Sequence, residues 1–136
     1  MSQRKIRKKA QAILNALDNP EAELSVVIVD DSAIEALNQK YLNRSGPTNV
    51  IAFPMREGEF SDLSPHLLGD VVISTETAGR EAHNSGISME ARFDQLLVHG
   101  ILHLFGFDHE SNQDDAARME AKTVELIEII GGVKDL

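Results

Sequence analysis

One apolar segment, residues 96–107, constrains the fold of this chain more than any other feature. It is apolar on nearly every side of a helix, and such a helix is buried inside a domain. It is too short to span a bilayer. The segment carries His99 and His103, and because they are four residues apart, their imidazoles stand about 40° from one another on one helix face. We therefore expect a central buried helix that presents a pair of metal ligands.

A third histidine follows closely. Gly106 can end the helix in a left-handed conformation, so that the chain turns back and delivers His109 to the same point. Three converging imidazoles with an open fourth position are the usual geometry of a catalytic zinc site. The spacing predicts that His99, His103 and His109 hold one zinc ion, although three imidazoles also suit nickel, copper or iron. The alternative is a histidine pair buried as ordinary core.

The spacing of these histidines is that of the metzincin proteases, H-E-x-x-H-x-x-G-x-x-H, with one change. Gly100 stands where those enzymes carry the glutamate that acts as general base. The ligand frame is retained while the base for peptide cleavage is missing. Zinc held by three neutral imidazoles would still lower the pKa of a bound water to about 7 and polarise a phosphoryl oxygen.

Composition restricts the setting of such a site. The chain has no cysteine, so it has no disulfide partner, and only His, Asp and Glu side chains remain for a metal. The first residues lack an apolar signal segment, which together with the missing cysteine favours a cytoplasmic protein. A net charge of −9 argues against general nucleic-acid binding, but five basic residues lie within residues 4–9. That run is either a solvated helix face or a local patch for phosphate or RNA.

Hydrophobic periodicity predicts alternating helices and strands, with helices dominating the second half. Helices are expected at residues 4–17, 75–84, 89–105 and 113–130, and a Ser32-x-x-Glu35 capping box opens another that runs through Leu42. Strands are expected at residues 24–29, 49–53 and 69–74, with loops at 43–47 and 55–67. We predict one α+β domain over residues 1–136, with a small mixed β-sheet covered by helices and the histidine helix in its core.

Several polar side chains outside the histidine run are further candidates for a site. Arg44 is a candidate to stabilise charge on phosphorus, because the bidentate fork of arginine suits phosphate; the alternative is a surface arginine. Thr48 and Asn49 offer groups for a nucleotide or for their own loop. Asp70 is a candidate proton acceptor, or an acid that pins a turn. Asp108, next to the third histidine, either orients a ligand ring or caps the following turn.

In three segments, residues 99–109, 47–54 and 68–74, the chain resembles the YbeY family of bacterial endoribonucleases, also called rRNA maturation factors. Residues 99–109 match the family signature H-G-x-L-H-L-x-G-[YF]-D-H at every fixed position. Residues 47–54, PTNVIAFP, are similar to the family's P-T-[DN]-V-L-S-F-P, and residues 68–74, LGDVVIS, to its L-G-D-[IL]-x-I-S. The matches extend in order over residues 37–130, which is most of the chain.

The resemblance implies that the three histidines bind zinc and that the protein cleaves single-stranded RNA. It also implies late maturation of the 3′ end of small-subunit rRNA and ribosome quality control, with the small ribosomal subunit, and ribosomal proteins or a GTPase, as partners. The family usually carries an arginine directly after the tyrosine that precedes P-T-[DN]. Here Tyr41 is followed by Leu42, and Arg44 is the candidate replacement. Two other functions stay open: a non-catalytic ribosome-assembly factor whose zinc holds the fold, and a metalloprotease.

Overall fold

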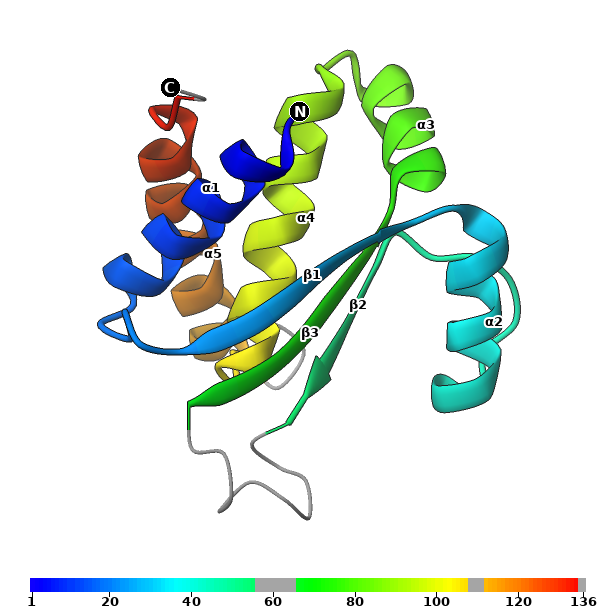
Figure 1. The fold of residues 1–136 in the computed structure, drawn as a ribbon, viewed down its shortest axis with the longest axis horizontal. Coiled ribbons are helices and arrows are strands. Elements are labelled where there is room, and N and C mark those ends of the chain that lie inside the picture. Colours follow the sequence, from blue (N-terminus) through cyan, green and yellow to red (C-terminus); the bar gives the residue numbers. More distant parts are fainter. Residues whose placement is uncertain (56–65, 108–111, 135–136) are drawn as a thin grey trace.

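The computed structural model describes residues 1–55, 66–107 and 112–134. Within these ranges every predicted helix and strand is present, with bounds that differ from the prediction by at most two residues, which confirms the α+β class (Figure 1). In chain order the elements are α1 (Gln3–Ala16), β1 (Glu23–Val29), α2 (Asp31–Leu42), β2 (Val50–Pro54), β3 (Leu67–Ser74), α3 (Thr75–Ser85), α4 (Met89–Leu104) and α5 (Gln113–Gly131).

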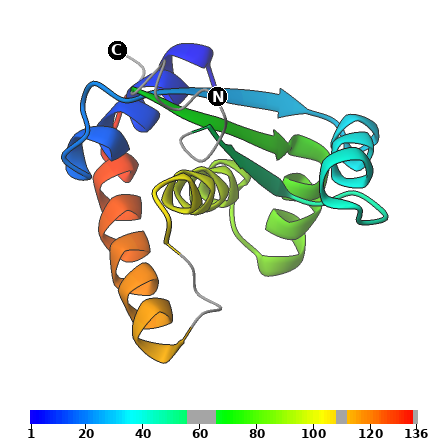
Figure 2. The same ribbon diagram turned by 90° about the horizontal axis from the view of Figure 1, so that it is seen from below.

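The sheet is mixed, as predicted, with the strand order β1-β3-β2. The central strand β3 pairs in parallel with β1 and in antiparallel with β2. Its apolar side chains are buried on both faces, because Val71 and Ile73 join the main core while Val72 packs against Ile34 of α2. Figure 2 shows α4 beneath the sheet, between α5 and α3. Because β3 is the central strand, the two edges of the sheet are β1 and β2.

Helix α4 is the buried helix that the sequence predicts. Leu97 and Ile101 have no exposed surface. Ser88 begins the helix by accepting a hydrogen bond from the backbone N–H of Ala91 at 3.0 Å. Gly106, two residues past the last helical residue, has φ +90°, so the predicted left-handed turn is confirmed. Among the described residues, no helix combines the length and apolar content needed to cross a membrane.

The capping box predicted at Ser32 is wrong. The residue that begins α2 is Asp30, whose Oδ1 accepts a hydrogen bond from the backbone N–H of Ala33 at 2.8 Å. A carboxylate is among the strongest N-cap acceptors, and Asp30 has the extended backbone that an N-cap needs. The N-cap consequently lies two residues earlier than predicted.

Asp31, the first residue of α2, lies at the carboxyl ends of the parallel strands β1 and β3. Its carboxylate accepts hydrogen bonds from Ser74 Oγ and Thr77 Oγ1, each at 2.6 Å. These two bonds lower the pKa of Asp31 to about 2, and Arg80 adds to the effect. Open α/β sheets commonly bind ligands at this edge, but here a protein carboxylate already occupies it.

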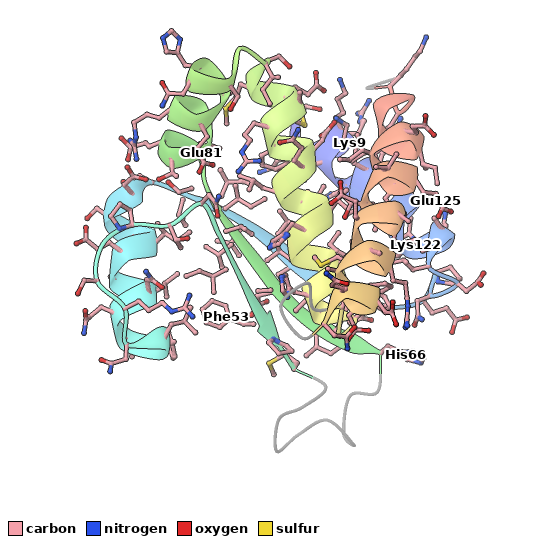
Figure 3. All side chains as sticks on the ribbon, turned by 180° about the vertical axis from the view of Figure 1, so that it is seen from behind. Lys9, Phe53, His66, Glu81, Lys122 and Glu125 are labelled. Atoms are coloured by element: carbon pink, nitrogen blue, oxygen red, sulfur yellow. The ribbon has the colours of Figure 1, made fainter. Side chains whose placement is uncertain are left out.

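Part of the basic run at residues 4–9 is internal. Lys9 is 1% exposed, and its Nζ donates to both carboxylate oxygens of Asp94, at 2.7 and 2.9 Å (Figure 3). Glu90 accepts from Lys9 and from Lys5, and the hydrogen bond from Lys5 is the main cause of the lowered pKa of Glu90. Burial raises the pKa of Asp94. A solvated face and an RNA patch are thus both wrong for Lys5 and Lys9, which hold α1 against α4.

We expect Lys9→Met to lower the free energy of unfolding by about 3–5 kcal/mol, because it leaves the carboxylate of Asp94 buried without its cation. The double variant Lys9→Met/Asp94→Leu should recover most of this loss, since it removes both charges. Lys122→Met is the control: Lys122 pairs with Glu125 on an exposed helix face, where a pair contributes about 0.5 kcal/mol or less. Urea unfolding at pH 7 measures all three, and equal losses for Lys9→Met and Lys122→Met would contradict the prediction.

Candidate functional site

A hollow of about 470 Å³ lies between α4 and the outer edge of β2. Its walls come from the end of α2 and the loop after it, from β2, from α4, and from the turn after α4. The lining residues are Leu42, Arg44, Val50, Ile51, Ala52, Pro54, His99, Gly100, His103, Gly106 and Phe107. A larger hollow of about 770 Å³, between α1 and β1, contains none of the predicted site residues. We therefore take the hollow beside β2 as the candidate site.

His99 and His103 point their ring nitrogens at the same spot in this hollow. Their Nε2 atoms are 3.1 Å apart, and the two rings are inclined at 68°. Two imidazoles bound to one tetrahedral zinc at about 2.0–2.1 Å have nitrogens about 3.3 Å apart, so the observed pair fits a shared ion. The pair meets the geometric requirement for two of the three predicted ligands.

The third predicted ligand, His109, lies outside the described residues, as does Asp108. Within residues 1–55, 66–107 and 112–134, no group of three His, Cys, Asp or Glu side chains is placed to hold a metal ion. The three-histidine site therefore stays a prediction from sequence spacing. Gly106 has the left-handed backbone that this prediction requires.

Gly100 decides how closely α4 approaches the sheet. A Cβ atom at this position would lie 2.6 Å from Val71 Cγ1 and 3.3 Å from Val50 Cγ2. Successive residues on a helix are about 100° apart, so position 100 is directed at β3 while His99 faces the hollow. A glutamate in place of Gly100 would be pushed against β3. The base position of the metzincins is here used for packing.

Arg44 shares the hollow with the two histidines. Its backbone N–H donates to the carbonyl of Asn38 at 3.2 Å, which fixes the loop after α2. Asn43, just before it, ends α2 in the left-handed conformation. The guanidinium makes no hydrogen bond or ion pair with the described part of the chain, so it is available to an anion.

Thr48 and Asn49 lie next to the hollow but do not line it. The side-chain amide of Asn49 donates to both carboxylate oxygens of Glu81, each at 3.2 Å. Glu81 projects from α3 toward the start of β2 (Figure 3). Asn49 thus joins the start of β2 to α3, a contact that is neither of the two predicted uses, because its partner lies 32 residues away. The role of Asn49 in binding a nucleotide stays a prediction.

Asp70 lies away from the histidines. It is in the middle of β3, paired with Ser25 of β1 and Phe53 of β2, so the expectation that it pins a turn is wrong. Side chains alternate along a strand, and Asp70 therefore shares the α2 face of the sheet with Val72. The structure does not bring this carboxylate to the hollow, which opens on the α4 side.

Sequence reasoning missed a polar cluster that joins α3, α4 and the start of β2. Arg92 donates from Nε and Nη2 to Glu81 Oε1, at 3.1 and 3.0 Å, and from Nη1 to Gln95 Oε1 at 2.7 Å. Arg92 and Gln95 lie on the same face of α4 as His99. This polar stripe on an otherwise apolar helix is the sequence signal that could have indicated the cluster. The partner Glu81 could not be identified from it, because it is 11 residues from Arg92 and 32 from Asn49.

We expect Gly100→Ala to lower the free energy of unfolding by about 1–3 kcal/mol, because the added methyl group overlaps Val71. This loss should appear although alanine favours a helix by about 1 kcal/mol over glycine. Val71→Ala in the same chain should restore part of it. The matched control is Gly79→Ala in α3, where a Cβ meets only Met89 Sδ at 3.8 Å and should stabilise. Thermal and urea unfolding measure these effects; a stabilised Gly100→Ala would refute the close contact.

The chain is similar to proteins of one known family. The family model described as endoribonuclease YbeY matches residues 1–131. A protein of Geobacter metallireducens named endoribonuclease YbeY is 52% identical over 127 residues, which cover 93% of this chain and 85% of that protein. A protein of the same name from Geobacter sulfurreducens is 51% identical over 128 residues, covering 93% and 85%. The resemblance read from the sequence motifs is confirmed.

The fold also matches a solved structure. The solution structure of a Thermotoga maritima protein superposes with a TM-score of 0.67, covering 93% of this chain and 79% of that one. At 23% sequence identity this likeness concerns the fold alone. It supports the arrangement of helices around a small sheet that positions the hollow.

Proposed function

This chain belongs to the YbeY family of endoribonucleases, and from that premise we propose that it is a zinc-dependent enzyme that cleaves single-stranded RNA. We propose further that it acts in the cytoplasm on the 3′ end of small-subunit rRNA, in late maturation and quality control of the ribosome. The small ribosomal subunit, with ribosomal proteins or a GTPase, would then be its partner. The observation that carries the proposal is the His99–His103 nitrogen pair in one hollow with Arg44.

We propose that one zinc ion is held by His99, His103 and His109. The 3.1 Å separation of the first two Nε2 atoms supports this, as does the absence of cysteine, which leaves imidazole as the natural zinc ligand. When bound, zinc supplies a water molecule of lowered pKa and Lewis-acid polarisation of a phosphoryl oxygen. The protein contributes the fixed direction of the two rings, which a buried helix sets.

Arg44 is proposed to bind the phosphodiester that is cleaved. A guanidinium donates two parallel hydrogen bonds to phosphate oxygens and can stabilise the charge that develops on them. Arg44 lines the hollow without a carboxylate partner in the described part of the chain. Leu42, which stands at the position where the family usually has arginine, lines the same hollow. Both positions therefore reach the site, and Arg44 supplies the cation.

The two alternative functions differ from this proposal in their chemistry. A metalloprotease needs a general base, but Gly100 has no side chain, and a Cβ atom at this position would overlap Val71 Cγ1 of β3. A non-catalytic assembly factor would need zinc only for its fold. That factor would still associate with ribosomal particles and restore rRNA maturation in cells after loss of the metal ligands, whereas an endoribonuclease would not restore maturation.

We expect His103→Ala to abolish cleavage of single-stranded RNA and to reduce zinc content below one ion per chain, because one ligand is lost. His109→Ala should also reduce zinc content but leave the helical circular dichroism unchanged, since it follows α4. His83→Ala is the control, because that side chain is exposed on α3 and should change neither quantity. Zinc is measured by mass spectrometry and cleavage on labelled RNA with and without chelator. Cleavage that survives His103→Ala would refute the assignment.

We expect Arg44→Ala to lower kcat/KM for RNA cleavage by about 10²-fold, the loss typical of one charge-stabilising donor. Zinc content should stay unchanged, because Arg44 is no metal ligand. Arg44→Lys should recover only part of the rate, since lysine lacks the bidentate fork. Adding Leu42→Arg to the Arg44→Ala chain should restore activity. The idea fails if Arg44→Ala cleaves at the native rate.

A further inference from the structure

Within the described part of the chain, the outer edge of β2 carries backbone groups that have no strand partner. The backbone N–H of Ser74 donates to the carbonyl of Asn49 at 3.0 Å, and the backbone N–H of Met55 donates to the carbonyl of Leu68 at 3.0 Å. In an antiparallel ladder, hydrogen-bonded pairs alternate with non-hydrogen-bonded pairs. Odd-numbered residues of β2 therefore bond to β3. The N–H and C=O groups of Val50 and Ala52 are directed away from β3, at the edge that forms one wall of the hollow.

Pro54 supports this assignment independently. Proline has no N–H to give, and within sheets it is confined to edge positions that face away from the neighbouring strand. Pro54 is paired with Gly69 at the same parity as Val50 and Ala52. The outer edge thus presents two donor–acceptor pairs, from Val50 and Ala52, and one further carbonyl. The two pairs are about 6.8 Å apart along the strand.

We propose that this edge is a nucleobase subsite, at which the backbone N–H and C=O of Val50 and Ala52 bind bases of single-stranded RNA beside the cleaved phosphodiester. The proposal rests on the endoribonuclease function and names how the substrate is held. Base edges offer neighbouring donors and acceptors, and unpaired bases in single strands expose them. Because the recognition uses backbone, it requires a base but distinguishes poorly among bases.

The surroundings of the edge favour RNA over a peptide strand as its occupant. Arg44 and the histidine pair line the same hollow as this edge, so a phosphate next to a bound base would find a cationic partner in Arg44. The remaining walls are apolar, formed by Leu42, Phe107 and the side chain of Ala52, and such surfaces suit the faces of bases. A peptide would satisfy the edge, but its backbone is uncharged, whereas every linkage of RNA carries an anionic phosphate for Arg44.

The test compares two oligomers of equal length and charge, a single-stranded oligouridine and its abasic counterpart, both with phosphorothioate linkages to slow cleavage. We expect the native chain to bind the base-bearing oligomer about tenfold more tightly, as one bidentate base contact allows. Ala52→Pro removes one outward N–H without breaking the ladder to β3, and should abolish this preference. Ala52→Val is the matched control, because it adds similar bulk, keeps the N–H and should keep the preference.

Hydrogen exchange on the native chain gives the same answer without a variant, should Ala52→Pro not fold. The amides of Val50 and Ala52 should become protected by oligouridine and not by the abasic oligomer, while the amide of Ile51, already bonded to β3, should not change. The subsite is refuted if Ala52→Pro keeps the preference or if these amides exchange equally with both oligomers. It is refuted also if only an extended Thr-Val repeat peptide protects them.

These outcomes are distinct from failure of the proposed function. If the native chain cleaves single-stranded RNA while Ala52→Pro retains the base preference, only the subsite is lost. If neither the native chain nor Ala52→Val cleaves RNA, the endoribonuclease proposal itself fails.

Discussion

The close contact between α4 and the central strand β3 holds the rest of the structure in place. At Gly100 the helix backbone lies so near Val71 that not even a methyl group fits between them. This contact sets the rotation of α4 about its axis. Because His99 and His103 lie about 100° away from the packed face or less, they emerge at the edge of the sheet rather than beneath it. The face of this buried helix that reaches the sheet edge is the one that carries the histidine pair.

Charged groups fix the other half of the same helix. Lys9 joins Asp94 in the interior, and Arg92 joins Glu81 on the opposite side of α4. Buried charges are costly unless they are paired and hydrogen-bonded; the buried pair of Lys9 and Asp94 meets that condition, and the half-buried Arg92 and Glu81 are hydrogen-bonded as well. They clamp α4 to α1 on one side and to α3 on the other. The ring nitrogens of the histidine pair, 3.1 Å apart, thus lie on a helix that is joined to its neighbours on two sides.

The hollow beside β2 brings together three kinds of chemistry that a nuclease needs. The histidine pair offers imidazole nitrogens, Arg44 offers a guanidinium without a carboxylate partner in the described part of the chain, and β2 offers backbone hydrogen-bonding groups. The histidine spacing is shared with metzincin proteases, yet position 100 serves helix packing. The histidine spacing alone therefore does not indicate a protease, because the position beside the first histidine packs against the sheet.

The order of the elements, the buried helix and the spacing of its histidines follow from the sequence alone. Each depends on local periodicity, on four-residue spacing within a helix, or on a glycine that permits a left-handed turn. Tertiary structure decided which other residues join them. The strand register places Asp70 on the face of the sheet away from the histidines. Lys9 is buried against Asp94, which lies 85 residues further along the chain. Arg44 lines the same hollow as the histidines because the fold brings the loop after α2 next to α4. Contacts between distant segments leave no periodic trace in a single sequence, so no reading of local pattern finds them.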